Sequence, residues 1–431
     1  MMSKKVISIL SIAINVVLTA CVAGLLISDT DNFELGEVAE TPMSFRKPFK
    51  AKDIEKMKRL IDNGSVMVVD SKGQVLLDYN GSEKMIPAST LKTITSLAAL
   101  HYLGEDYRFK TDFKLDDKNN LYIKGYGDPH LISEELQLIC KKLAKMGLRT
   151  INSIYLDGSY FEGYIMVPGI EDSYESYDAR NSALAANFNT IDFRRTWNGL
   201  RSGEPATPLI GYSKVILKKA EKEDVKLKNK ARVRISIKEE RDSLLYFGYL
   251  FKEFCKRASI KVKGKVLVGK SPVSQAIYYQ HKSSKKLSEV VKNLLEFSNN
   301  FTANQLLLTM GVKAGKGPAT LKSGLKVLSG YVKNVLKIDG IRLTEGSGIS
   351  YANKVSARQM IAVVHHLKPY KSLLKEVQER VLAKSGGLKT VNSLVGFIES
   401  PRNGELKFAI ILNQSTNNKP QLLKIITETL F

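Results

Sequence analysis

Apolar residues recur with the two-residue period of a β-strand in some parts of this chain and with the period of an α-helix in others. Each change of period marks a boundary between predicted elements. Residues 65–69 and 74–79 are apolar runs that flank Ser71-Lys72-Gly73, a pattern that predicts a β-hairpin. A basic helix is expected before the hairpin, at about 52–63. After it, residues 87–100 predict a turn that runs into a buried helix, because a Pro-Ala pair precedes a long apolar segment.

From about residue 107 the pattern changes to short strands separated by loops. The expected elements are strands at Phe109–Leu115, Leu121–Lys124 and Ile151–Leu156, a helix at Ser133–Met146, loops to about Trp197, a helix near Ser243–Arg257 and a strand near Lys261–Val268. We interpret this block, residues 107–274, as a separate inserted domain that is mainly β.

Residues 225–237 alternate almost without a break inside this block. Apolar side chains lie on one side and lysines and arginines on the other, which predicts a strand with one buried face and one cationic face. A solvated charged face is the simpler interpretation. Docking of an anionic glycan is the alternative.

Helical periodicity returns after the block, and strands follow near the C-terminus. The expected elements are helices at Leu287–Phe297, Thr302–Leu308, Leu321–Leu336 and Ser356–Leu367, strands at Val391–Ser400 and Leu406–Asn413, and a terminal helix at Pro420–Leu430. Strands near both ends predict one antiparallel sheet that is flanked by helices. The predicted fold class is α/β in the α+β sense, with one domain formed by residues 51–106 and 275–431.

The N-terminus has the pattern of an export segment. Two lysines precede an apolar run at residues 6–28, which is a signal peptide or a membrane anchor. Leu-Thr-Ala-Cys at 18–21 is similar to a bacterial lipoprotein cleavage box, but the run stays apolar after Cys21, which favours an uncleaved anchor. Residues 1–28 are predicted to be this segment and 29–50 a linker. The positive-inside rule then places the body outside the cytoplasm, in the periplasm or at the cell envelope.

The chain carries a large excess of positive charge. It has 431 residues, of which 66 are Lys or Arg and 43 are Asp or Glu, and the formal net charge is +23. This charge favours polyanionic partners, and export favours anionic cell-wall polymers over nucleic acid, for which the sequence has no motif. Cys140 and Cys255 fall on apolar faces of predicted helices, so buried thiols are the simpler expectation and a disulfide is the alternative.

Ser89 and Lys92 are the candidate nucleophile and base. Residues three apart share a helix face, so the Lys92 amine can reach the Ser89 hydroxyl. Only about one free lysine in 2,500 is neutral at pH 7, so Lys92 needs burial or a cationic neighbour to act as a base. Other Ser-x-x-Lys copies exist in the chain, but the Ser89 copy alone combines a Pro-Ala turn with a long apolar helix.

Two more short segments complete a set of three. Ser298-Asn299-Asn300 follows a predicted helix, and Lys384-Ser385-Gly386-Gly387 is expected to open a strand. The order Ser89/Lys92, Ser298/Asn300, Lys384/Gly386 is typical of the serine acyl-transferases that react with penicillin. The five histidines have no paired metal-ligand spacing and there is no Gly-x-Ser-x-Gly elbow, so neither a zinc peptidase nor an α/β-hydrolase is predicted.

With these motifs the chain resembles the D-alanyl-D-alanine carboxypeptidase/endopeptidase family, the class C low-molecular-mass penicillin-binding proteins, over about residues 50–420. The segments that also carry the resemblance are Gly125-Tyr126-Gly127-Asp128-Pro129, Leu156-Asp157-Gly158-Ser159-Tyr160-Phe161, Asn187-Phe188-Asn189, and Glu345-Gly346-Ser347-Gly348-Ile349-Ser350 with Asn353. The resemblance implies a catalytic domain of the DD-peptidase/β-lactamase type and a peptidoglycan hydrolase without cofactor or metal. Its implied partners are peptidoglycan stem peptides and, as covalent inhibitors, β-lactams.

The resemblance also assigns catalytic roles. Ser89 is expected to attack the carbonyl between two D-alanines and form an acyl-enzyme that water releases, with Lys92 as the base. Ser298 and Lys384 are expected to pass a proton to the leaving amine, and Asn300 to hold the substrate amide. The oxyanion is expected between the backbone N–H groups of Ser89 and Gly387.

Several positions are expected to bind substrate, and some of them depart from the family pattern. Asp157 matches the acidic residue that reads the amino end of the diamino acid. The full set of expected substrate-binding residues is Asp157, Ser385, Gly386, Gly387, Ser347, Ile349 and Tyr351. Ser385 replaces Thr, Gly387 replaces a hydroxyl residue, Tyr351 replaces Arg, and only 38 positions separate Gly346 from Lys384. We expect a wider and less selective cleft that favours cross-linked peptides over free pentapeptide.

Two other functions remain open at this point. A β-lactamase shares the fold and the nucleophile, but it needs a group that activates water for fast deacylation, and none stands out near Ser298. A cell-wall-binding protein that keeps the fold without activity is the other alternative, favoured by the missing hydroxyl at Gly387 and by the basic segment 225–237.

Overall fold

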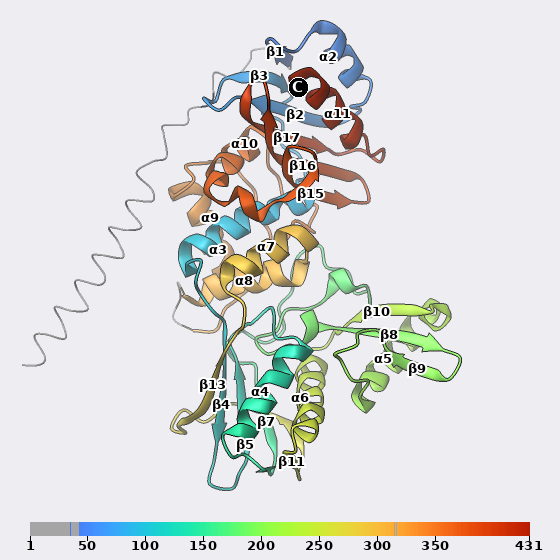
Figure 1. Ribbon diagram of the computed structural model, residues 1–431, viewed down its shortest axis with the longest axis vertical. Helices are drawn as coiled ribbons and strands as arrows, with labels where there is room; N and C mark the ends of the chain where they lie inside the picture. The colour runs from blue at the N-terminus through green and yellow to red at the C-terminus, as the bar shows by residue number, and fades with distance from the viewer. Residues whose placement is uncertain (1–34, 36–42, 314, 316) are drawn as a thin grey trace, which may run out of the picture.

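A computed structural model describes residues 35, 43–313, 315 and 317–431, so the predicted export segment at 1–28, with Cys21, lies outside the described residues. Within those described ranges no helix has both the length and the apolar character needed to cross a bilayer. The molecule is elongated: a seven-stranded sheet with its helices forms one end, and the segments between α3 (Lys92–Leu103) and α7 (Leu287–Phe297) form the other (Figure 1).

The seven-stranded antiparallel sheet is built from both ends of the chain, as predicted. Its strands, in spatial order, are β1 (Met43–Phe45), β3 (Val75–Tyr79), β2 (Gly64–Val69), β17 (Gly404–Leu412), β16 (Val391–Ser400), β15 (Val381–Leu388) and β14 (Lys375–Gln378). Alternate side chains of β2 divide between two cores, since Val66 and Val68 face one side and Met67 and Val69 the other. The sheet is therefore buried on both faces.

Different helices cover the two faces of this sheet. α2 (Ala51–Lys58) and α11 (Lys419–Leu430) pack on one face. The other face carries α3 (Lys92–Leu103), α7 (Leu287–Phe297), α8 (Asn300–Lys313), α9 (Leu321–Asn334) and α10 (Ala357–His366). All of residues 92–100 are buried, because α3 is enclosed by the sheet and by its neighbouring helices. Lys92 is therefore the first residue of a helix that is enclosed along most of its length.

The segment between α3 and α7 forms a second core of its own. A five-stranded sheet has the order β12 (Val266–Val268), β7 (Ile154–Asp157), β5 (Leu121–Gly125), β4 (Lys110–Leu115) and β13 (Ile277–Lys282), and α4 (Ser133–Lys145) and α6 (Glu240–Arg257) pack with it. β13 pairs with β4, so the strand just after residue 274 belongs to this sheet. The Cys140 and Cys255 thiols are free and face each other in this core, 3.7 Å apart.

A smaller unit projects from this core and is called the arm below; it spans residues 190–236 (Figure 1). It consists of β8 (Thr190–Thr196), β9 (Gly199–Ser202) and β10 (Arg232–Ser236) with α5 (Gly211–Glu223). The two-stranded pair of β6 (Thr150–Ile151) and β11 (Lys261–Val262) lies beside α6. The sequence analysis placed loops where β8 begins and missed α5.

The single strand predicted at 225–237 is wrong. Residues Val225–Asn229 form a short 3-10 helix, because the Asp224 side chain accepts a hydrogen bond from the Lys226 N–H and starts a helical turn, and Leu227 is buried. β10 covers the remaining part of the segment. Its two arginines are ion-paired: Arg232 and Arg234 both contact Asp192, which lies opposite Arg234 on β8, and Arg234 also pairs with Glu204.

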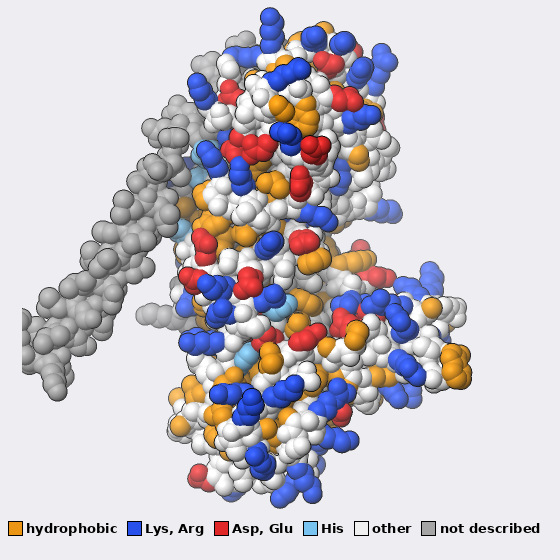
Figure 2. Space-filling view, viewed as in Figure 1, with side chains coloured by type: hydrophobic (Ala, Val, Ile, Leu, Met, Phe, Trp, Pro, Cys, Tyr) orange, Lys and Arg blue, Asp and Glu red, His pale blue; other side chains and the backbone are white. Residues whose placement is uncertain are grey.

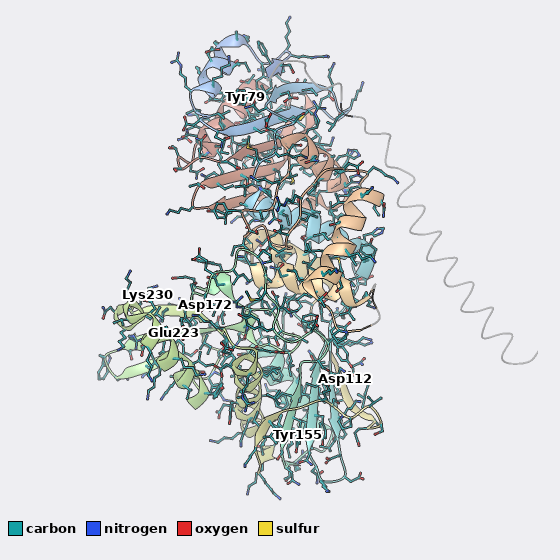
Figure 3. All side chains as sticks on the ribbon, turned by 180° about the vertical axis from the view of Figure 1, so that it is seen from behind. Tyr79, Asp112, Tyr155, Asp172, Glu223 and Lys230 are labelled. Carbon is teal, nitrogen blue, oxygen red and sulfur yellow. The ribbon has the colours of Figure 1, made fainter. Side chains whose placement is uncertain are left out.

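Other charges of the arm are paired as well. Lys238 lies 2.8 Å from Glu223 and 3.4 Å from Asp172, and Lys230 lies 3.6 Å from Glu175. Figure 3 shows Asp172, from the segment that precedes the arm, gathered with Glu223 and Lys230 of the arm. The basic segment therefore gives little support to glycan docking on this face.

Candidate active site

The turn that carries Ser89 is held by two glycines from distant segments. Residues Ala88–Leu91 form a 3-10 turn that precedes α3, so Ser89 lies just before the α-helix rather than in its first turn. A Cβ on Gly348 would lie 1.9 Å from the Ala88 carbonyl oxygen, and one on Gly386 would lie 2.8 Å from the Ser89 nitrogen. Such contacts are too short for any side chain, so both segments approach the turn because they have none.

Lys92 is the centre of the hydrogen-bond network. Its Nζ lies 2.8 Å from Ser89 Oγ, 2.8 Å from Asn300 Oδ1 and 2.6 Å from the Ser347 carbonyl oxygen. Burial and, second, the Lys384 ammonium lower the pKa of Lys92 to about 7, against an opposing effect of Glu345. About half of the Lys92 amines are then neutral at pH 7, compared with a very small fraction of free lysine.

Ser298 and Lys384 come together from the end of α7 and from β15. α7 ends at Phe297, and Ser298 follows in the left-handed region with φ 59°. Lys384 donates hydrogen bonds to Ser298 Oγ at 3.0 Å and to the Ser385 carbonyl oxygen at 2.8 Å. Burial and the nearby Lys419 lower its pKa to about 8. The prediction that Lys384 opens a strand is wrong, because it lies in the middle of β15.

The four residues of the segment Lys384-Ser385-Gly386-Gly387 are alternately buried and exposed, as the two-residue period of a strand requires. Lys384 and Gly386 are buried toward the catalytic turn, while Ser385 and Gly387 are exposed. The edge neighbour β14 pairs with the first part of β15 and ends before the motif, since Lys375 is opposite Ala383. The Ser385 and Gly387 positions are therefore open to a ligand.

Glu345 organises the loop that supplies the Ser347 carbonyl to Lys92. Its fully buried carboxylate accepts hydrogen bonds from the Ser347 N–H and hydroxyl, both at 2.6 Å, the Gly348 N–H at 2.6 Å and the Asn353 amide at 2.7 Å. The Ser347 hydroxyl thus faces Glu345, and the backbone carbonyl of Ser347 faces Lys92. The Glu345-Gly-Ser-Gly pattern was visible in the sequence, but this anchoring role was not predicted.

Tyr351, Ile349 and Asp157, which were also expected to bind substrate, differ in their exposure to solvent. Tyr351 is 45% exposed, whereas Ile349 is buried. The Asp157 carboxylate is buried and accepts hydrogen bonds from the backbone N–H groups of Ser159 and Ser271, with Lys124 3.7 Å away. Among the described residues, no hydrogen bond links Asp157 to the catalytic network.

A loop of the inserted segment also reaches the hydrogen-bond network around Lys92, a contact that the sequence analysis did not predict. Asn300 uses its amide nitrogen to bind the Tyr177 carbonyl oxygen at 3.2 Å, while its amide oxygen accepts from Lys92. Gly169 packs against the backbone of Ser350 so closely that a Cβ would lie 2.6 Å from its Cα. The inserted segment therefore contacts both Asn300 and the loop that follows Ser347.

The fold and the site share three features with the serine enzymes that react with penicillin. These are the antiparallel sheet, the enclosed pair of Ser89 and Lys92, and the second pair of Ser298 and Lys384, which other segments supply. The chain belongs to the D-Ala-D-Ala carboxypeptidase 3 (S13) family, whose model matches residues 51–233 and 226–380. The predicted family membership and fold class are confirmed.

Individual relatives agree with this assignment. The chain is 25% identical to the D-alanyl-D-alanine carboxypeptidase of Actinomadura sp. (strain R39) over 430 residues, which cover 83% of this chain and 79% of that protein. The crystal structure of penicillin binding protein 4 (dacB) from Haemophilus influenzae superposes with a TM-score of 0.70 at 20% identity, covering 87% of this chain and 98% of that one. A predatory peptidoglycan endopeptidase from Bdellovibrio bacteriovorus has a TM-score of 0.51 at 16% identity, with coverages of 85% and 92%.

Proposed function

We propose that this protein is a penicillin-sensitive serine hydrolase of peptidoglycan that cleaves the peptide bond between two D-amino acids through an acyl-enzyme. The observation that carries the proposal is the contact of 2.8 Å between Lys92 Nζ and Ser89 Oγ, together with a Lys92 pKa of about 7. A lysine in this state takes up a proton at neutral pH, which a free lysine does not. Membership of a carboxypeptidase family supports the choice of substrate.

The acylation step follows from the contacts around Lys92. The neutral Lys92 amine takes the Ser89 proton while Ser89 Oγ bonds to the carbonyl carbon, and the resulting oxyanion is held by backbone N–H groups of Ser89 and Gly387. The carbon–nitrogen bond then breaks. The leaving nitrogen receives its proton from the Ser298 hydroxyl, which is replenished by Lys384 3.0 Å away.

Deacylation uses the same groups in the reverse direction. Water replaces the leaving amine and bonds to the acyl carbon, while its proton passes through the Ser298 hydroxyl to Lys384, which acylation left neutral. Ser89 takes its proton back from the Lys92 ammonium as the ester bond breaks. Asn300 orients the substrate amide, because both ends of its side chain are fixed, by Lys92 and by the Tyr177 carbonyl. The exposed Ser385 hydroxyl is available for the terminal carboxylate of the substrate.

The preferred substrate is a cross-linked peptide rather than a free pentapeptide. Gly387 is exposed and has no side chain to bind a carboxylate, and exposed Tyr351 stands at the rim of the same loop that contacts Lys92. Both features favour an open acceptor side of the cleft, which a peptide bridge requires and a terminal D-alanine does not. Digestion of isolated peptidoglycan with separation of the products by mass tests this: faster release of D-alanine from pentapeptide than cleavage of cross-links would contradict it.

Labelling with fluorescent penicillin tests the catalytic assignment itself. We expect stable labelling of the protein and none of the Ser89→Ala variant, because the label is attached through the Ser89 oxygen. A label that is lost within a few turnovers would indicate a β-lactamase, whereas failure of the folded wild type to label would indicate a wall-binding protein without activity.

The place of action forms part of the proposal. The substrate lies outside the cytoplasm, and the apolar run at residues 6–28 with lysines before it supplies an export signal or an anchor. Fractionation of cells that produce the full chain, followed by protease treatment of intact and of permeabilised cells, tests this. Recovery of the protein from the cytoplasm would contradict it.

A further inference from the structure

A cavity far from Ser89 lies between the arm and the core that is formed by the five-stranded sheet with α4 and α6. It has a volume of about 750 Å³ and is lined by the start of α5, the second half of α6 and the strand β11. In Figure 1 these elements lie in the lower half of the molecule, whereas α3 and β15, which begin with Lys92 and contain Lys384 respectively, lie in the upper half. The cavity is large enough for a ligand of several sugar units or a short peptide, since ligand sites commonly measure 300–1,000 Å³.

The floor of this cavity contains an aromatic pair. Tyr212 of α5 and Tyr249 of α6 stack with ring centroids 5.1 Å apart and an interplanar angle of 27°. The Tyr212 hydroxyl donates to Asp242 at 2.6 Å, which fixes its ring, and Tyr249 remains 37% exposed. A rigid, partly exposed aromatic surface is suited to the apolar C–H face of a pyranose ring, because both surfaces are flat and the contact costs little conformational entropy.

The rim of the cavity is strongly cationic. Lys252, Lys256, Arg257 and Lys261 line it, and the one carboxylate among the lining residues, Glu253, pairs with Arg257 at 3.3 Å. Within the described part of the chain, no acidic side chain lies within ion-pairing distance of Lys252, Lys256 or Lys261, in contrast to the paired arginines of β10. Figure 2 shows basic side chains on both the arm and the lower part of the molecule. The rim therefore favours a ligand with negative charges spaced along it.

We infer that this cavity binds the glycan strand of peptidoglycan and holds the enzyme on its polymeric substrate. The strand combines the two required features, since its sugars have apolar faces and every second sugar carries a lactyl group that ends in a carboxylate or in an acidic peptide. The choice of this polymer rests on the proposed function. The site itself rests on Tyr212, Tyr249 and the unpaired lysines.

The test measures binding of folded protein to sacculi from which attached polymers and proteins have been removed. The Ser89→Ala variant is used so that the ligand is not consumed. We expect Lys256→Glu/Lys261→Glu to weaken binding about tenfold, because two attractive charges become repulsive, and Tyr249→Ala to weaken it several-fold. Lys218→Glu/Lys222→Glu, which reverses two exposed charges on α5 outside the cavity, is the matched control and is expected to leave binding nearly unchanged.

Three results would overturn the inference: an equal loss in the Lys218→Glu/Lys222→Glu control, full binding by Tyr249→Ala, or stronger competition by polyglycerol phosphate than by peptide-free glycan strands. The outcome is separable from that of the proposed function. Site variants that retain Ser89 must still be acylated by penicillin at the wild-type rate. Failure of acylation in the wild type would refute the hydrolase, while loss of sacculus binding in the site variants would still establish the cavity.

Discussion

Removal of the Lys384 ammonium tests whether the two lysines are electrostatically coupled. Lys92 contacts Asn300 and Lys384 contacts Ser298, two residues earlier, so the two ammonium groups share one small site. Lys384 is the second cause, after burial, of the low pKa of Lys92. Even at a separation of roughly 10 Å, two unit charges interact by about 1.7 kcal/mol at an effective dielectric constant of about 20, which corresponds to more than one pH unit.

In the Lys384→Met variant we therefore expect the pKa of Lys92 to rise from about 7 by roughly one unit or more. The assay is the second-order rate constant of acylation by penicillin between about pH 5.5 and 9.5, because its acid limb reports the protonation of the base in the free enzyme. The wild-type limb is expected near pH 7 and the variant limb near pH 8. A wild-type decline above about pH 8, where Lys384 loses its proton, is expected to vanish in the variant.

The position of the limb is informative even though Lys384→Met also removes a group from the proposed proton relay, because a lost relay lowers the rate without moving the limb. Lys375→Met removes an exposed charge from the neighbouring strand β14 and serves as the matched control. An acid limb that stays at pH 7 in Lys384→Met, or that moves equally in both variants, would refute the coupling.

Three further substitutions test the surrounding structure. Glu345→Gln places an amide nitrogen against backbone N–H donors, so we expect the free energy of unfolding, measured in urea, to fall by about 2–4 kcal/mol; an unchanged midpoint would contradict the anchoring role. Gly348→Ala creates a 1.9 Å contact with Ala88 and is expected to slow acylation by penicillin by more than about 100-fold. Gly340→Ala, which has a similar φ but no nearby atom closer than 3.6 Å, controls for backbone strain and should retain activity. Burial raises the pKa of Asp128 to about 6, so the folded state loses stability as pH rises from about 4 through 6. Asp128→Asn should therefore raise the melting temperature at pH 7.5, by an amount equivalent to up to about 3 kcal/mol, and have little effect at pH 4.

Elements with long apolar periods could be predicted closely from the sequence. The helix Leu287–Phe297 and the strand Val391–Ser400 have the predicted bounds, because their burial alone fixes the spacing of apolar residues. The segment 225–237 was misassigned because its alternation continues across a helical turn started by Asp224, where a local side-chain hydrogen bond overrides the pattern. α5 was missed although Ile216, Leu217 and Ala220 have helical spacing.

The sequence predicts the three motifs of the site, but it does not predict the contacts between distant loops that orient Asn300 and Asp157. The serines and lysines of the three motifs meet in the expected order. The contact between Tyr177 and Asn300 spans 123 positions and depends on a loop without periodicity, so no local pattern predicts it. The internal hydrogen bonds of Asp157 likewise depend on Ser271, more than a hundred positions away.

The close packing around Ser89 and the low pKa of Lys92 both depend on Gly348 and Gly386. Because Gly348 and Gly386 have no side chains, two segments close over the turn before α3, and this closure excludes water from Lys92. Burial is the largest cause of the low pKa of Lys92, so any change that opens the closure both displaces the Ser347 carbonyl and returns the lysine to its charged form. The defect of Gly348→Ala should therefore diminish at high pH, where Lys92 is neutral without burial, whereas a purely geometric defect would persist at every pH.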